Sequence, residues 1–152
     1  GIVVARLFNM VRPTRAYFGQ KDLQQVAVVR RLIEDLAFPV ELVPCPTVRE
    51  ADGLAMSSRN RRLSLEHRIR APFIYQSLTE AREQLISGSS VEEVKNMMRE
   101  QYAQRRAFLL EYFEVAHAHT MQLVDERLPE GQTALCLAAH LDGVRLIDNV
   151  VF

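Results

Sequence analysis

An amphipathic helix between two short apolar segments is the feature that most restricts how this chain can fold. Apolar residues recur at helical spacing from Leu23 to Leu36, which gives the predicted helix one face for a core. Residues 15–18 and 40–43 flank it as short apolar segments of the kind that form buried strands. A further apolar helix is predicted at residues 2–10. The order helix, strand, helix, strand favours parallel strands joined by a right-handed crossover, and hence an α/β fold.

A long loop follows these elements, and the elements after it are of a different kind. Residues 44–62 lack a helical period and contain proline, glycine, serine and asparagine. Loops of this length inside a compact domain are usually functional or disordered. Asp142-Gly143 is a strong hairpin signal between the last two of three predicted strands. The predicted elements after the loop are helices at 64–87 and 90–106 and strands at 110–115, 133–141 and 144–151.

Local signals mark the starts and breaks of the helices. Asp22 followed by Gln25, and Ser90 followed by Glu93, match the capping-box pattern at which helices begin. Pro72 must kink the first helix after the loop or lie near its first turn. We therefore expect two domains: a partial α/β unit with a parallel sheet at residues 1–62, and a small α+β unit with an antiparallel sheet at residues 63–152.

The composition argues against several classes of protein. The 152 residues carry 19 Lys and Arg against 19 Asp and Glu, a balance that argues against a nucleic-acid binder driven by positive charge. The longest apolar runs fall far short of the ~20 residues that span a membrane. Cys45 and Cys136 are too few for a disulfide framework or a zinc knuckle. We expect a cytoplasmic protein with no nucleic-acid or membrane partner and no metal held by its own side chains.

The first candidate site is the turn between the first predicted strand and the helix that follows it. Ligands of open α/β sheets bind at the carboxyl ends of the strands, where Gly19, Gln20, Lys21 and Asp22 are found. A helix N-terminus presents backbone N–H groups to an anion, and Lys21 adds a positive charge that suits a phosphate. The alternative is an ordinary strand-to-helix turn with a solvated lysine, and these residues alone do not decide between the two.

The second candidate site lies in the long loop. Ser57 and Ser58 supply hydroxyls, and Arg59 supplies a fork of donors that suits phosphate oxygens. Gly53 offers a hinge. A mobile loop that closes over a nucleotide would exclude water and stabilise the charge that develops on a leaving pyrophosphate. The alternative is a polar surface loop whose arginines are merely solvated.

Three stretches of the sequence resemble a known family. Residues 18–25, which read Phe-Gly-Gln-Lys-Asp-Leu-Gln-Gln, and residues 46–60 are similar to the pantothenate synthetase (pantoate–β-alanine ligase) family. Residues 143–149 resemble the C-terminal hairpin of that family. The resemblance covers essentially the whole chain. It implies a Rossmann-like nucleotidyltransferase fold with HIGH-like and KMSKS-like motifs, in which the first predicted domain is the C-terminal part of the nucleotide-binding domain and the second is a lid.

The resemblance also implies an ATP-dependent ligase of pantothenate biosynthesis, on the pathway to coenzyme A. Pantoate would react with ATP to give pantoyl adenylate and pyrophosphate, and β-alanine would then displace AMP. Mg²⁺ held mainly by the phosphates, and a homodimer of the full-length enzyme, are implied as well. The implied catalytic residues are Lys21, Ser57, Ser58 and Arg59, and Gln25 is the implied pantoate ligand. The residues implied to bind ATP are Gly19, Gln20, Lys21, Asp22, Val48, Met56, Ser57, Ser58 and Arg59.

The catalytic histidine motif of the family does not occur in this chain. There is no His-x-Gly-His, and the resemblance places that motif and the β-alanine contacts N-terminal to Gly1. The chain also opens inside a helical pattern without an initiator Met. We therefore expect the C-terminal portion of a longer enzyme, inactive in isolation. The alternatives are another adenylate-forming or nucleotidyl-transferring enzyme, and a fragment that acts only as a folding or assembly module.

Overall fold

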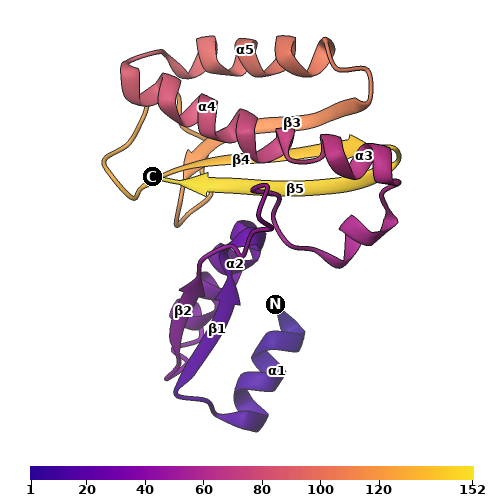
Figure 1. Cartoon of the computed structure of the whole chain (residues 1–152). Coiled ribbons are helices and arrows are strands. Elements are labelled where there is room, and N and C mark those ends of the chain that lie inside the picture. The colour runs from indigo at the N-terminus through magenta and orange to yellow at the C-terminus, as the bar shows by residue number, and fades with distance from the viewer. The chain divides into compact units, whose positions relative to one another are not determined.

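The computed structural model describes all 152 residues and divides into two compact units, Gly1–Thr47 and Val48–Phe152. Each unit has a sheet of its own, parallel in the first and antiparallel in the second (Figure 1). The expected fold class, a parallel α/β unit followed by a small α+β unit, is confirmed. Neither unit contains a helix that is both long enough and apolar enough to cross a membrane.

In the first unit, helices and a parallel strand pair enclose a small core. Its elements are α1 (Ile2–Val11), β1 (Arg15–Gly19), the 3-10 turn η1 (Gln20–Asp22), α2 (Leu23–Asp35) and β2 (Glu41–Cys45). β1 and β2 pair in parallel, with Arg15 opposite Glu41, which confirms the parallel pair that the intervening helix predicted. Phe8, Val29 and Val40 are the buried residues of this core.

The start of α2 differs from the prediction. Asp22 occupies the N-cap position, but its side chain makes no capping hydrogen bond. Asp22 is the last residue of the turn η1 and has φ −99° and ψ 63°, which is not the extended conformation that an N-cap residue usually adopts. The predicted capping box of Asp22 and Gln25 is therefore wrong. The helix itself follows the predicted apolar face, with Leu23, Val26 and Val29 buried.

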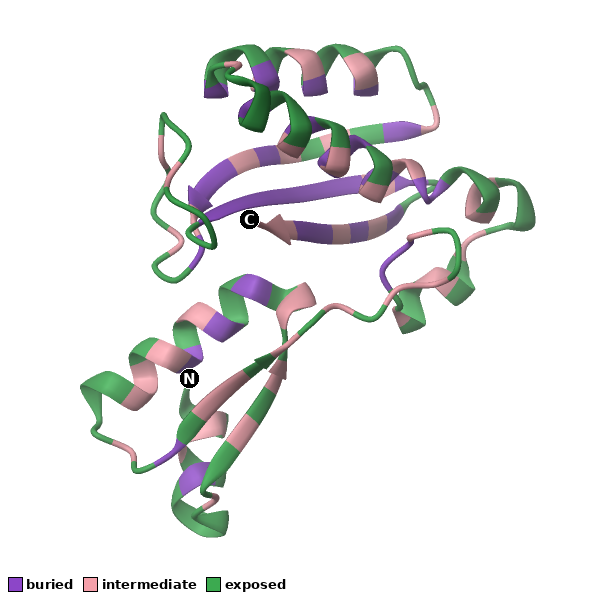
Figure 2. Ribbon diagram, turned by 60° about the vertical axis from the view of Figure 1, so that its left-hand side comes forward, coloured by how far each residue is buried: buried purple, intermediate pink, exposed green.

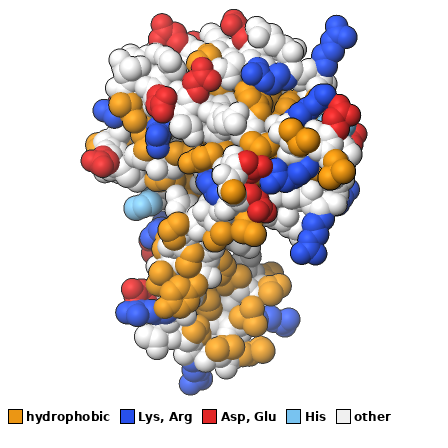
Figure 3. Space-filling view, viewed as in Figure 1, with side chains coloured by type: hydrophobic (Ala, Val, Ile, Leu, Met, Phe, Trp, Pro, Cys, Tyr) orange, Lys and Arg blue, Asp and Glu red, His pale blue; other side chains and the backbone are white.

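Apolar side chains remain exposed on the first unit. α1 buries Phe8, whereas Ile2, Val3, Met10 and Val11 are 80%, 70%, 75% and 67% exposed. Figure 3 shows apolar side chains gathered over this unit. Contiguous apolar surface of this kind is typical of interaction faces. The first unit therefore covers only part of α1 by itself.

The second unit is a three-stranded antiparallel sheet with helices packed on it. Its elements are the 3-10 helix η2 (Ser58–Arg62), α3 (Leu65–Arg70), α4 (Phe73–Ser87), α5 (Val91–Ala103), β3 (Phe108–His117), β4 (Thr133–Leu141) and β5 (Val144–Val151). β4 is the central strand and is buried along almost its whole length (Figure 2). α4 and α5 lie over one face of the sheet and contribute Ile74, Leu78 and Met98 to the core.

Local chemistry accounts for the ends of several elements in this unit. Asp142 and Gly143 both adopt positive φ, 52° and 72°, as the predicted tight hairpin requires. The capping box is confirmed, because Ser90 accepts a hydrogen bond from the backbone N–H of Glu93 and donates its own backbone N–H to the Glu93 carboxylate. Pro72 divides the predicted long helix into α3 and α4, since proline has no N–H for the helical hydrogen bond.

The two units divide at a different place from the predicted domains. The predicted boundary lies between residues 62 and 63, whereas the compact units divide between Thr47 and Val48. Residues 48–62 belong with the second unit because Leu54 is buried in its core and Arg49 is bound to β5. All of the long loop from Val48 onward is therefore a structural part of the antiparallel unit.

Replacing Ser90 with alanine removes half of the capping box of α5. We expect Ser90→Ala to lower the free energy of unfolding by about 1 kcal/mol, the usual cost of losing an N-cap. Urea unfolding followed by circular dichroism measures the change. Ser89→Ala, one residue earlier, is the matched control and is expected to cost less than about 0.5 kcal/mol. Equal losses for the two variants would contradict a specific cap.

Candidate active site

The first candidate site lies at the carboxyl end of β1. Gly19 ends that strand, and Gln20, Lys21 and Asp22 form the turn that leads into α2. Gln20 and Lys21 are half-buried, while Asp22 is exposed. Gly19 has an ordinary φ of −68°, and a Cβ added there would meet nothing within 4 Å. The backbone conformation therefore does not require glycine. Because Gly19 has no side chain, it leaves the backbone of this turn uncovered. Gln25 lies exposed in the first turn of α2, at the same end of the unit.

The second candidate site is the site loop, residues 46–60, and its central part is a small hairpin. The backbone N–H of Met56 donates to the carbonyl of Val48 at 2.9 Å, and Arg49 and Ala55 form an antiparallel bridge. Val48 and Met56 are therefore neighbours, 66% and 50% exposed. An exposed apolar pair of this kind is suited to lie against the face of a planar ring.

Ser57 is the N-cap residue of the 3-10 helix η2. Its side-chain oxygen accepts a hydrogen bond from the backbone N–H of Arg59 at 3.2 Å, which leaves the hydroxyl hydrogen available to a ligand. The Asn60 side chain donates to the carbonyl of Ala55 at 3.0 Å and so holds this turn against the hairpin. Ser58 and Arg59 are exposed. Two hydroxyls and a guanidinium therefore belong to one short, anchored turn.

A partly buried arginine ties the site loop to the sheet. The Arg49 guanidinium donates to both carboxylate oxygens of Asp148 on β5, at 2.6 and 3.0 Å. It also donates to the carbonyls of Gly53 and Asn149, at 3.1 and 3.3 Å, and lies 3.7 Å from the centre of the Tyr75 ring. The Asp148 side chain is 1% exposed. Arg49 therefore neutralises a buried charge that would otherwise be costly.

Gly53 packs against the same aromatic ring. It has a φ of +91°, and a Cβ placed on it would lie 2.6 Å from Cδ1 of Tyr75. Any other residue would meet both the ring and the strain of a left-handed backbone. Packing against Tyr75 therefore explains why this position is a glycine. The role of Gly53 as a hinge stays a prediction.

A second ion pair holds the tip of the site loop. Arg68 of α3 donates to the Asp52 carboxylate at 2.6 Å, and the other Asp52 oxygen accepts from the backbone N–H of Leu54 at 3.2 Å. The hydrogen bond from Arg68 holds the pKa of Asp52 below its usual value. The loop is therefore anchored twice, near its start by Arg49 and at its tip by Asp52.

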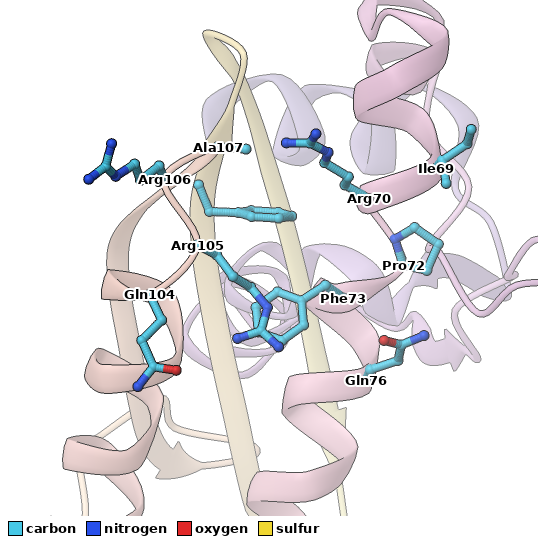
Figure 4. Close-up of a pocket in the computed structure, with 10 residues that line it drawn as sticks. Ile69, Arg70, Pro72, Phe73, Gln76, Gln104, Arg105, Arg106 and Ala107 are labelled. Carbon is cyan, nitrogen blue, oxygen red and sulfur yellow. The ribbon is translucent and has the colours of Figure 1, made fainter.

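A cavity of about 620 Å³ lies elsewhere in the second unit, between the start of α4 and the start of β3 (Figure 4). The Arg105 guanidinium lies 3.9 Å from the centre of the Phe73 ring and donates to the carbonyl of Gln101 at 3.0 Å. Arg70, also at this cavity, pairs with Glu66. These two arginines serve packing and ion pairing, and none of the predicted site residues lines the cavity.

The structure assigns the predicted site residues to both units. Those of the second unit are Val48, Met56, Ser57, Ser58 and Arg59, and those of the first are Gly19, Gln20, Lys21, Asp22 and Gln25. Sequence reasoning missed the anchors Arg49, Tyr75 and Asp148. The available signal was Asp148, an acidic residue within an apolar strand, because a buried carboxylate needs a cation.

Comparison with known proteins gives the family of this chain. The family model for pantoate-beta-alanine ligase matches residues 1–151. The chain belongs to this family. Pantothenate synthetases of Cytophaga hutchinsonii and Chloroflexus aggregans are 42% and 49% identical to it over 151 and 148 residues. These matches cover 99% and 97% of this chain and 53% of each relative, so the chain spans about half the length of the curated relatives it matches.

Solved structures of pantoate-beta-alanine ligases share the fold. Pantothenate synthetase from Thermus thermophilus matches with a TM-score of 0.90 at 45% identity, over 98% of this chain and 53% of that one. The Francisella tularensis ligase, complexed with beta-gamma ATP and beta-alanine, matches with a TM-score of 0.66 at 30% identity, over 98% and 48%. The family resemblance seen in residues 18–25 and 46–60 is confirmed. The position of this chain as the C-terminal portion of its family's enzyme stays a prediction.

Replacing Gly53 tests whether the Tyr75 ring constrains the site loop. We expect Gly53→Ala to lower the free energy of unfolding by about 2–3 kcal/mol, because backbone strain and overlap with the ring add. Chemical unfolding measures the loss. Gly131→Ala is the matched control, since Gly131 has a similar φ of +77° with open space around its Cβ position. If the two variants lose equal stability, the ring is not the constraint.

The Asp52–Arg68 pair predicts a shift in titration. Arg68→Gln should raise the pKa of Asp52 toward its usual value, as followed by carboxyl NMR shifts across pH. Because folding lowers this pKa, the stability from the pair is present above the unfolded value of about 4 and is lost as pH falls through the folded value. Arg70→Gln is the control, since Arg70 pairs with Glu66 instead. An unchanged Asp52 titration in Arg68→Gln would contradict the assignment.

Proposed function

We propose that this chain forms part of an enzyme that joins pantoate to β-alanine with the consumption of ATP. The observation that carries the proposal is the family match over residues 1–151, in a chain whose site loop presents Ser58 and Arg59 on an anchored turn. A fixed set of hydroxyl and guanidinium donors is what a charge developing on phosphate oxygens requires.

The proposed reaction has two steps. The pantoate carboxylate attacks the α-phosphorus of ATP, and the bond to the bridging oxygen breaks, which gives pantoyl adenylate and pyrophosphate. The amine of β-alanine then attacks the acyl carbon, loses a proton and expels AMP, which leaves pantothenate. Both leaving groups are phosphate anions, so the protein must stabilise negative charge at each step.

We assign the phosphate contacts to the predicted catalytic residues Lys21, Ser57, Ser58 and Arg59. Lys21 supplies a compact positive charge beside the N-terminal end of α2. Backbone N–H groups at a helix N-terminus can donate to an anion as well. Ser57, Ser58 and Arg59 act on the pyrophosphate side. Ser57 suits this role because its oxygen is already occupied by a backbone N–H, so its hydroxyl hydrogen points elsewhere.

The remaining predicted residues orient the substrates. Val48 and Met56 form the exposed apolar pair against which the adenine ring lies. Gly19, Gln20 and Asp22 complete the nucleotide turn, whose uncovered backbone allows close approach. Gln25 supplies an amide to the pantoate, since it can donate and accept hydrogen bonds at once.

We also propose Mg²⁺, held by the phosphates of ATP. The chain has no group of three or more His, Cys, Asp or Glu side chains that could hold a metal ion, and Mg²⁺ commonly binds through substrate phosphates with few protein ligands. When bound, it would neutralise phosphate charge. The exposed apolar face of α1 supports assembly, which we propose to be a homodimer of the longer enzyme, in the cytoplasm.

The proposal is tested in a chimera in which residues 1–151 replace the matching part of the Thermus thermophilus relative. We expect pantoate-dependent release of pyrophosphate and formation of pantothenate. Lys21→Ala and Arg59→Ala are each expected to lower the rate of pyrophosphate release by at least about 100-fold, since each removes a charged donor from the developing charge.

Arg31→Ala, on the exposed surface of α2, is the control and is expected to stay within about twofold of the parent. A folded chimera that releases no pyrophosphate, or a Lys21→Ala variant at the parent rate, would contradict the proposal. Release that occurs only with a different hydroxy acid would favour another adenylate-forming enzyme. Absence of any adenylate-forming activity would favour an assembly module.

A further inference from the structure

We propose that Arg49 is a positioning residue, which sets where the ligand-binding residues of the site loop stand. It acts through the loop and not on the substrate. The inference rests on the proposed function, because it gives a contact within the second unit a part in nucleotide chemistry. Its structural half, that Arg49 holds the loop, can be measured without any activity.

Arg49 joins three parts of the second unit at one point. Its N–H groups bind Asp148 on the sheet, at 2.6 and 3.0 Å, and the Gly53 carbonyl within the loop, at 3.1 Å. Its flat face covers the Tyr75 ring of α4. A lysine has neither the planar fork nor the stacking face, so it cannot make these contacts together. The start of the loop is therefore held against a strand and a helix at once.

A short series of contacts leads from Arg49 to η2. Arg49 forms an antiparallel bridge with Ala55, which is 3% exposed. The Ala55 carbonyl accepts from the Asn60 side chain at 3.0 Å, and the backbone N–H of Asn60 donates to the Ser57 carbonyl at 3.1 Å. A shift of Arg49 is therefore passed on to the turn that carries the catalytic hydroxyls and guanidinium.

The position of these donors matters more in the transition state than in the ground state. Donors stabilise a developing charge only if they are already in place when it forms. Without Arg49, Ser58 and Arg59 are still present in the chain, but their positions are no longer fixed. It should therefore slow pyrophosphate release much more than it weakens ground-state binding of the nucleotide.

The first test is Arg49→Lys in the chimera described above, which keeps the charge and removes the fork. Single-turnover pyrophosphate release at saturating MgATP and pantoate is expected to fall by about 100-fold, as a displacement of about 1 Å produces. The KM for MgATP is expected to change by less than about threefold. Arg145→Lys is the matched control, because Arg145 binds Glu111 through two N–H groups on the exposed side of the same sheet. It should stay within about twofold of the parent.

A double variant separates positioning from a general loss of structure. If Arg49 acts through Arg59, adding Arg49→Lys to Arg59→Ala should cost less than about threefold more, because the donor it positions is already gone. If the rate of pyrophosphate release in the double variant falls by the product of the two single-variant factors, the proposal is overturned. A folded Arg49→Lys chimera whose rate of release is within about twofold of the parent would overturn it as well.

Amide hydrogen exchange of the 152-residue chain tests the loop without activity. Arg49→Lys is expected to speed exchange at residues 56–62 by at least about tenfold and to leave residues 133–141 unchanged. Unchanged exchange in the loop would overturn the proposal. If Arg49→Lys does not fold, Asp148→Asn takes its place with the same expected pattern. A parent chimera without activity would count against the proposed function, and exchange would still decide whether Arg49 holds the loop.

Discussion

The ion pair between Arg49 and Asp148 is the interaction on which the site loop depends. It joins residues 99 positions apart in the sequence, so only the tertiary fold brings them together. A carboxylate that is 1% exposed is tolerated only beside a cation of matching geometry. The guanidinium meets both oxygens and also covers the Tyr75 ring. The polar loop has no core of its own, and this ion pair fixes it against the antiparallel unit.

The turn of the first unit depends on local structure instead. It consists of consecutive residues between β1 and α2 and is held by one parallel strand pair and a small core. Parallel strands are usually buried on both faces, and here much of α1 remains exposed. The two candidate sites therefore differ in physical origin. One is built by neighbours in sequence, the other by contacts between distant residues.

The same distinction explains which predictions succeeded. The Asp142-Gly143 hairpin and the capping box at Ser90 were predicted correctly because each depends on residues that lie next to or near one another. The capping box at Asp22 failed because Asp22 ends a 3-10 turn and lacks the extended conformation of an N-cap residue. The domain boundary was missed because Leu54 belongs to the core of the second unit, which loop composition does not reveal.

By itself, the sequence determined the order of the elements, the family and the chemistry of the candidate residues, because periodicity, turn residues and motifs are properties of short stretches. Only the tertiary structure decided that residues 48–60 of the site loop belong to the antiparallel unit and that Arg49 holds them there. The physical reason is that the contribution of a charged side chain to stability depends on its burial and on its partner. Both are set by which distant residues the fold brings within a few ångströms.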